Sequence, residues 1–194
     1  MQNVEVKLRC TEQTLAQVGA RAQALGARLA GRLEQVDTYF VAPRGRLKLR
    51  EIRAAGRAAE AWLIGYGRPD TTGARVSAYE MVPVHDPAAL LATLGGPLGV
   101  RVRVEKVRAV WLLRHTRIHL DEVRGLGAFV ELETVVVGPA GARRADADDD
   151  ADADGAVDVV AGERELRELV AALGLRLTDG LAGSYADLVE ERGA

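Results

Sequence analysis

Arg46-Leu-Lys-Leu-Arg50 and Val130-Glu-Leu-Glu133 alternate strictly between apolar and charged side chains. Successive side chains of a β-strand point to opposite faces, so each stretch predicts a strand with one apolar and one charged face. The charged face is wholly basic in the first stretch and wholly acidic in the second. Like charges on such a face lie about 6.5–7 Å apart. They repel one another unless water, a metal ion or a polyanion lies between them.

The period of two recurs along most of the chain. The spacing of these segments is typical of hairpins in an antiparallel sheet. Helical periodicity and capping residues interrupt the strands at several points, with Thr11 and Asp86 as predicted N-caps. The predicted strands lie at 3–10, 34–41, 46–50, 60–68, 75–83, 100–113, 117–121 and 129–133, and the predicted helices at 12–29, 87–94, 163–173 and 183–191.

The charged faces predict the architecture. One such strand is an ordinary solvated face, but several in one chain indicate that the charged faces converge on a common interior. The apolar faces then point outward and need a cover, which the amphipathic helices supply. We therefore expect an α+β protein with a closed eight-stranded antiparallel β-barrel, a polar charged lumen and helices packed outside. A lumen rich in Lys and Arg with a carboxylate cluster suits a polyanion together with a hard cation.

Composition favours a protein of the reducing cytoplasm. The chain has 194 residues, a formal net charge of −2 and one cysteine, Cys10. A single cysteine excludes an intrachain disulfide, and the N-terminus has charges where a signal peptide needs an apolar core. We expect no membrane span, and no nucleic-acid partner because aromatic residues are only 4% of the chain.

Residues 138–162 differ in kind from the rest of the chain. They are acidic and of low complexity, and such a segment buries too little apolar surface to offset its ordering entropy. We predict a disordered insertion there, within a single domain that spans residues 1–194. A calcium loop is the alternative, but the glycine and terminal glutamate of an EF-hand are out of register.

The motifs taken together resemble the CYTH superfamily, the triphosphate tunnel metalloenzymes that include class IV adenylate cyclases and thiamine triphosphatases. Its hallmark is Glu-x-Glu-x-Lys near the N-terminus. Here residues 3–7 read Asn-Val-Glu-Val-Lys, so Asn3 replaces the first glutamate. The similarity continues through residues 37–40, 45–50, 62–70, Arg75, Ser77, Tyr79, 106–108, 118–123, 126–127 and 129–133, and resumes weakly at 184–188.

The resemblance implies roles for the charged residues. Several cations are expected to bind phosphate oxygens, and carboxylates to hold Mg²⁺ or Mn²⁺. Surface salt bridges are the alternative for each cation, and pairing with lumen arginines for the glutamates. The implied phosphate ligands are Lys7, Lys48, Arg50, Arg68, Lys106 and Arg108, with Arg46, Arg75 and Arg117 at the tunnel mouth; the implied metal ligands are Glu5, Asp121, Glu131 and Glu133; and the implied catalytic residues are Lys7, Lys48, Arg50 and His119.

His119 shares the presumed inner face with Arg117 and Asp121, where it either moves protons or serves as a hydrogen-bonded lining residue. The expected substrate is a nucleoside triphosphate, thiamine triphosphate or tripolyphosphate. The expected reaction is hydrolysis of that triphosphate, or cyclisation of ATP to cyclic AMP and pyrophosphate. A non-catalytic module that binds polyphosphate or a phosphorylated ligand is the alternative. The protein is expected to be a monomer or a homodimer.

Overall fold

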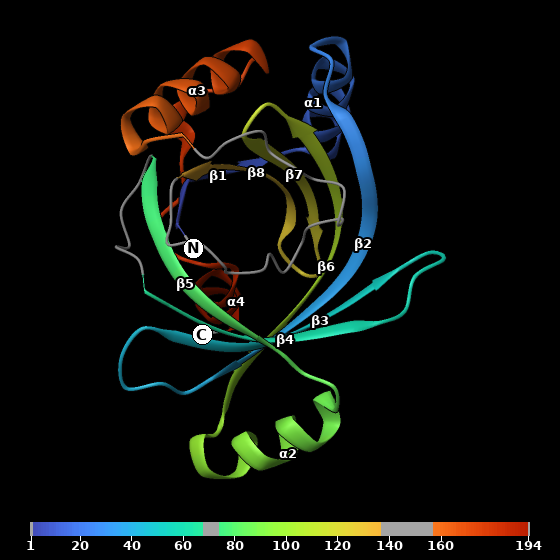
Figure 1. Ribbon diagram of the computed structural model, residues 1–194, viewed down its shortest axis with the longest axis vertical. Helices are drawn as coiled ribbons and strands as arrows, with labels where there is room; N and C mark the ends of the chain where they lie inside the picture. The colour runs from blue at the N-terminus through green and yellow to red at the C-terminus, as the bar shows by residue number, and fades with distance from the viewer. Residues whose placement is uncertain (1, 68–73, 137–156, 194) are drawn as a thin grey trace.

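The computed structural model describes residues 2–67, 74–136 and 157–193. These residues form strands and helices that are arranged as Figure 1 shows. The strands are β1 (Gln2–Cys10), β2 (Arg28–Phe40), β3 (Arg46–Ala54), β4 (Glu60–Gly67), β5 (Arg75–Pro83), β6 (Val100–Leu113), β7 (Thr116–Val123) and β8 (Gly127–Val136). The helices are α1 (Glu12–Ala24), α2 (Pro87–Leu98), α3 (Val159–Ala172), the 3-10 helix η1 (Leu177–Asp179) and α4 (Tyr185–Gly193).

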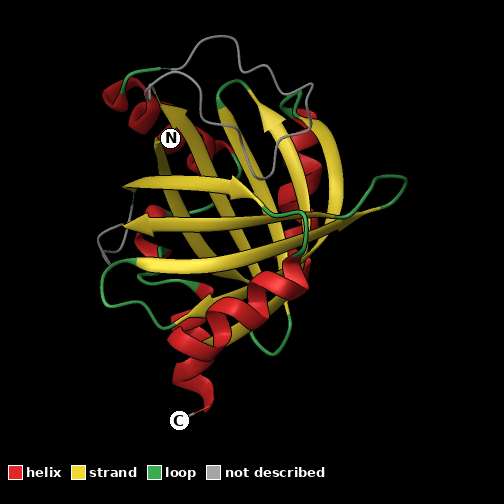
Figure 2. Ribbon diagram, turned by 60° about the horizontal axis from the view of Figure 1, so that its bottom comes forward, coloured by secondary structure: helices red, strands yellow, loops and turns green. Residues whose placement is uncertain are grey.

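The strands form one closed antiparallel barrel in the order β1-β5-β4-β3-β2-β6-β7-β8. Figures 1 and 2 show them curving around a single axis. Most neighbours in the barrel are consecutive in the chain, but β1 lies between β5 and β8. Its pairing with β8 sets Glu5 beside Glu133 and Lys7 beside Glu131. The predicted eight-stranded barrel is therefore confirmed.

The apolar strand faces point outward and are covered by helices, as predicted. On one side Val6 and Leu132 are completely buried in a cluster to which α1 contributes Val18 and α3 contributes Leu169. Each such side chain contributes about 1.5–3 kcal/mol when fully buried. This arrangement leaves the interior of the barrel to the charged faces.

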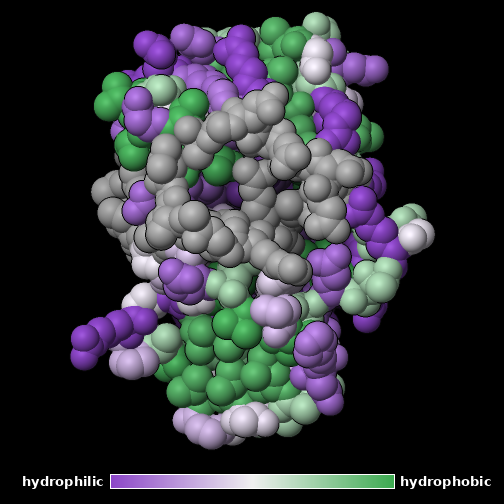
Figure 3. All heavy atoms as spheres, viewed as in Figure 1, coloured by the Kyte–Doolittle hydropathy of each residue, from purple (hydrophilic) through white to green (hydrophobic). Residues whose placement is uncertain are grey.

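Helix α2 covers another part of the barrel. Its leucines pack against a smaller cluster that includes Phe40 of β2 and Leu49 of β3. Figure 3 shows an apolar surface at the end of the molecule where α2 lies. None of the described helices combines the length and apolar character that a membrane crossing requires.

Several element boundaries differ from the prediction. Helix α1 ends at Ala24 instead of residue 29, because Gly26 adopts a φ of 87° and turns the chain into β2. As a result β2 begins at Arg28, six residues before the predicted start. Helix α2 continues through Gly95, Gly96 and Pro97 to Leu98, which packs against the barrel with Leu94. The predicted caps are confirmed: Thr11 Oγ1 accepts from the Thr14 amide at 3.1 Å and Asp86 from the Ala89 amide at 2.9 Å.

The predicted disordered insertion at 138–162 is wrong at its C-terminal end. Val157 bridges to Val136, and α3 starts at Val159 with Asp158 as its N-cap. Gly162 packs closely against Val136 and lies within the helix. Packing against β8 therefore makes α3 begin four residues before its predicted start. The remainder of the insertion lies outside the described residues.

Candidate functional site

The described residues enclose a cavity inside the barrel, with a volume of about 710 Å³ that includes the part open to solvent. Six basic and four acidic side chains border it, which gives a net charge of +2 when all are ionised. The lining residues are Lys7, Lys48, Arg50, Lys106, Arg108, Arg117, Glu5, Asp37, Glu131, Glu133, Asn3, Tyr39, Ile64, Tyr66, Ser77, Tyr79, Met81, Ser184 and Tyr185.

On one side of the cavity, Asp37 of β2 holds two cations of β3. Its carboxylate accepts from Lys48 Nζ at 2.9 Å and from Arg50 Nε and Nη2 at 2.8 and 2.9 Å. Burial opposes ionisation of Asp37, but Arg50 and Lys48 outweigh it and hold the pKa of this carboxyl well below its ordinary value. Burial and the adjacent Arg50 charge lower the pKa of Lys48 to about 8, against the opposing effect of Asp37.

A second cluster joins β6, β7 and β8. Arg108 donates Nε and Nη2 to the two oxygens of Asp121, each at 2.7 Å, and Nη2 also reaches Glu131 at 2.7 Å. Tyr185 donates its hydroxyl to Asp121 at 2.7 Å, and Lys106 lies 3.4 Å from the same carboxylate. Burial raises the pKa of Asp121, yet Arg108 and Lys106 hold it below its ordinary value. Asp121 therefore stays ionised and orients Arg108.

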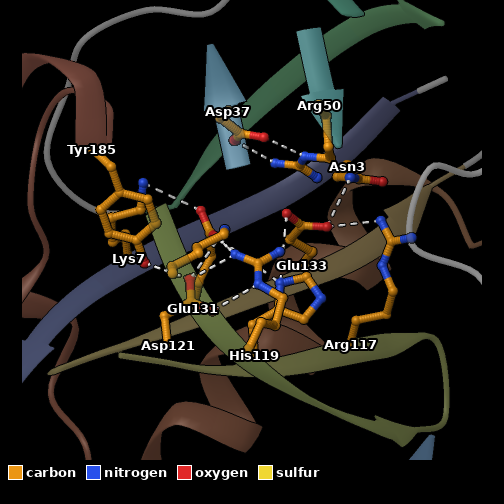
Figure 4. Close-up of polar contacts among 12 residues, drawn as sticks. Asn3, Lys7, Asp37, Arg50, Arg117, His119, Asp121, Glu131, Glu133 and Tyr185 are labelled. Atoms are coloured by element: carbon orange, nitrogen blue, oxygen red, sulfur yellow. Dashed lines mark hydrogen bonds and ion pairs between the residues drawn. The ribbon is translucent and has the colours of Figure 1, made fainter. Parts of the chain in front are cut away.

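The acidic part of the cavity lies on β8. Glu131 is 3.4 Å from Lys7 Nζ, and Glu133 accepts from Arg117 Nη2 at 2.7 Å. Asn3 lies beside Glu133 and Arg117; its amide is best satisfied with the nitrogen donating to the Gln2 carbonyl at 2.9 Å and the oxygen accepting from Arg117 Nη2 at 3.2 Å. Figure 4 shows Glu131 across the site from Asp37, with Glu133 between them and Asn3 next to Arg50. Burial raises the pKa of both glutamates, but the cations outweigh it and hold each pKa below its ordinary value.

These carboxylates meet the basic requirement for holding a cation. Single ligand atoms of Glu131, Glu133 and His119 lie within 4.8 Å of one another. Both glutamates are ionised, and carboxylate oxygen is a normal ligand for Mg²⁺ and Mn²⁺. Glu5 borders the same cavity from β1. The donor set therefore fits a divalent metal ion.

The start of α4 lines one end of the cavity. The Tyr185 ring lies 3.8 Å from Lys7 Nζ and 5.1 Å from Lys106 Nζ, within the range of cation–π attraction. Asp187 of the same helix accepts from Arg46 at 2.9 Å and from Arg101 at 2.7 Å. These ion pairs hold α4 against β3 and β6.

The structure brings most of the predicted site residues together. Five of the six predicted phosphate ligands and three of the four predicted metal ligands border the cavity, as does Arg117. Arg46 pairs with Asp187 instead, and Asp121 and His119 lie behind the lining with no exposed surface. Arg68 and the side chain of Arg75 lie outside the described residues.

Sequence reasoning assigned no role to Asp37 or Tyr185. Asp37 was detectable, since the period of two places it on the same face as Tyr39. For Tyr185 the sequence signal was only the weak resemblance at residues 184–188, because this residue comes from a helix that is distant in sequence.

A closed antiparallel barrel with a charged interior cavity defines a β-tunnel. Residues 1–144 match the CYTH domain family, and the chain therefore belongs to this family. No curated protein matches the chain.

Solved structures share the fold at low sequence identity. The protein PH1819 from Pyrococcus horikoshii OT3 is 21% identical, with a TM-score of 0.72 over 98% of this chain and 99% of that chain. A proposed adenylate cyclase from Vibrio parahaemolyticus is 19% identical, with a TM-score of 0.68 over 97% of each chain. HpAC1 from Hippeastrum, a proposed adenylyl cyclase with a dominant triphosphatase activity, is 15% identical, with a TM-score of 0.58 over 98% of this chain and 95% of that chain.

Proposed function

We propose that the protein is a metal-dependent enzyme that binds the triphosphate group of its substrate in the cavity and cleaves a phosphoanhydride bond. The observation that carries this proposal is the convergence of six buried cations on one cavity that also contains a carboxylate cluster. Burying so many charges is unfavourable unless each is paired with an opposite charge. A bound polyanion together with a divalent cation adds further pairs at this position.

The cations are already oriented for this role. Asp37 fixes the side chains of Lys48 and Arg50, and Asp121 fixes Arg108. Fixed donors need little reorganisation when charge develops on a transferring phosphoryl group, which is why preorganised cations stabilise its transition state. The net charge of +2 rises to +4 with one divalent cation, which is comparable in magnitude to the charge of an ionised triphosphate.

Glu131 and Glu133 are the proposed metal ligands, with Glu5 facing the same space. A divalent cation bound there supplies neutralising charge to the phosphate oxygens. Asn3 brings an amide instead of a carboxylate to this region and so removes one negative charge. Asp121 was a predicted ligand, but both of its oxygens accept from Arg108, and we assign it the role of positioning that arginine.

The proposed reaction is hydrolysis of the terminal phosphoanhydride. A water oxygen forms a bond to the terminal phosphorus, the bond to the bridging oxygen breaks, and orthophosphate and a diphosphate are released. In cyclisation the ribose 3′-hydroxyl of ATP replaces water, attacks the α-phosphorus and expels pyrophosphate. The dominant triphosphatase activity of HpAC1 is consistent with placing hydrolysis first, although the similarity extends only to the fold.

A product assay tests the proposal. The protein is incubated with ATP, thiamine triphosphate and tripolyphosphate in the presence of Mg²⁺ or Mn²⁺, and orthophosphate, pyrophosphate and cyclic AMP are measured separately. Orthophosphate without cyclic AMP identifies a triphosphatase, and tripolyphosphate then yields pyrophosphate as the second product. Cyclic AMP with pyrophosphate from ATP identifies a cyclase. Tight binding of tripolyphosphate with no product under either metal would refute the enzyme proposal and leave the non-catalytic binding module.

Matched variants of β3 link the activity to the cavity. Lys48→Gln removes one charge from the lining, whereas Arg53→Gln removes one from the exposed outer face of the same strand. Loss of a charge-assisted hydrogen bond costs about 1.5–3 kcal/mol, so tripolyphosphate binding weakens roughly 10- to 100-fold in Lys48→Gln. Arg53→Gln should bind as the wild type does. Equal behaviour of the two variants would place the ligand elsewhere.

A further inference from the structure

His119 lies directly against the acidic cluster. It pairs with Glu131 across β7 and β8, and its Nδ1 is 3.9 Å from Glu131 Oε2 and 3.8 Å from Glu133 Oε1. Figure 4 shows the ring next to both carboxylates. Two atoms that each lie about 2.1 Å from one shared ion are about 3–4 Å apart. The three side chains therefore have the spacing of ligands around a single ion.

The surroundings of His119 leave its ring unsatisfied. The side chain has an exposed fraction of 0%, and neither ring nitrogen has a hydrogen-bond partner among the residues that the structure describes. Separations of 3.8 and 3.9 Å are too long for hydrogen bonds. Since buried polar groups are nearly always paired, an unpaired imidazole beside two carboxylates indicates that something else binds between them.

The two carboxylates are themselves held in place by other groups. Arg108 donates to Glu131 Oε2, the oxygen that faces His119, and Arg117 donates to Glu133 Oε2, which leaves Glu133 Oε1 facing His119; both hydrogen bonds measure 2.7 Å. Carboxylates that ligate metals are usually oriented in this way by a second set of hydrogen bonds. The arginines therefore fix the direction of the ligand oxygens before any ion arrives.

We propose that His119 is a nitrogen ligand, so that His119, Glu131 and Glu133 form a mixed nitrogen–oxygen site for a first-row transition-metal ion. This extends the metal site of the proposed function and changes its selectivity. Mg²⁺ prefers oxygen ligands, whereas an imidazole nitrogen strengthens the binding of Mn²⁺ and later ions of the row. The site binds Mn²⁺ more tightly than Mg²⁺ without a triphosphate present.

Pulsed electron paramagnetic resonance of Mn²⁺ bound to the full chain tests this directly, because a coordinated imidazole produces nitrogen-14 modulation. We expect modulation in the wild type and its loss in His119→Ala, with Mn²⁺ affinity reduced on the order of tenfold or more. Mg²⁺ affinity, measured by competition, should change much less. His119→Gln provides a second variant with a polar side chain of similar length if the alanine variant folds poorly.

His85→Ala is the matched control, because His85 is exposed and lies far in sequence from the cluster. Its nitrogen modulation should equal that of the wild type. Modulation absent from the wild type, or persisting in both His119 variants, would overturn the assignment and indicate that a proton or a water molecule joins His119 to the carboxylates.

The result can be separated from the proposed function, since the spectroscopic measurement uses no triphosphate. Nitrogen-coordinated Mn²⁺ in a protein that yields no product supports the site and refutes the enzyme. Turnover by a protein whose bound Mn²⁺ shows no nitrogen coupling supports the proposed enzyme activity and refutes His119 as a metal ligand.

Discussion

The Asp37→Asn variant tests how much the buried cations Lys48 and Arg50 depend on a neighbouring carboxylate for the stability of the fold. The substitution preserves the shape of a side chain that is 2% exposed, but it removes the negative charge opposite Lys48 and Arg50. Breaking a buried ion pair by removing one partner costs about 3–5 kcal/mol. Lys48 already has a pKa of about 8, so it can release its proton in the variant and reduce the penalty. Arg50 cannot.

We therefore expect the lower end of that range, a loss of about 3 kcal/mol in the free energy of unfolding. For a domain of this size the melting temperature should fall by about 6–12 °C. Urea denaturation at pH 7, followed by the fluorescence of Trp62 and Trp111, measures the change. Asp179→Asn is the control, since its ion pair with Arg176 is exposed and contributes about 1 kcal/mol or less.

The same variant gives a second readout. Tripolyphosphate without metal should stabilise Asp37→Asn more than the wild type, because the added anion takes the place of the missing carboxylate. A stability loss below about 1 kcal/mol, or equal stabilisation of both proteins by the ligand, would refute the reasoning.

Three further outcomes are expected. Metal-free affinity for tripolyphosphate should fall as pH rises through about 8, because Lys48 is cationic below its pKa and neutral above it. In Lys48→Arg this fall should move to higher pH. Both proteins are titrated by calorimetry over the same pH range, so that the effect of ligand ionisation is common to both and drops out of the comparison. Tyr185→Phe should lose about 1–2 kcal/mol in urea denaturation, because Asp121 loses one buried hydrogen bond; an unchanged midpoint would contradict this. Leu169→Ala should lose about 2–5 kcal/mol in the free energy of unfolding by the same measurement, since it leaves a cavity between α3 and the barrel. A loss below about 1 kcal/mol would show that the packing of α3 contributes little to stability.

The inward direction of the charged strand faces was predictable because apolar and charged residues alternate along several strands. Leu47 and Leu49 alternate with three cations on β3, and the same logic holds for the acidic strand β8. A strand can satisfy such a pattern only by placing its apolar side against other apolar groups and its charged side near opposite charges. This depends on local sequence alone, and hence the fold and most lining residues follow from it.

The pairing of the charges was less predictable because it depends on tertiary structure. Asp121 matches a metal-ligand position by sequence, yet Arg108 and Tyr185 approach it from β6 and α4 and occupy its oxygens. The C-terminal end of α2 was also hard to predict because it depends on tertiary packing. Gly95, Gly96 and Pro97 favour an earlier end, but the packing of Leu94 and Leu98 on the barrel offsets their low helix propensity.

The position of β1 between β5 and β8 has a consequence for how the chain folds. Strand β1 cannot complete its pairing until β8 has been synthesised, since residue 5 pairs with residue 133. Contacts of such high sequence separation slow folding, and until they form β1 and β8 present unpaired edges that can recruit other chains. Refolding should therefore be slow and strongly dependent on protein concentration, with aggregation competing with closure of the barrel.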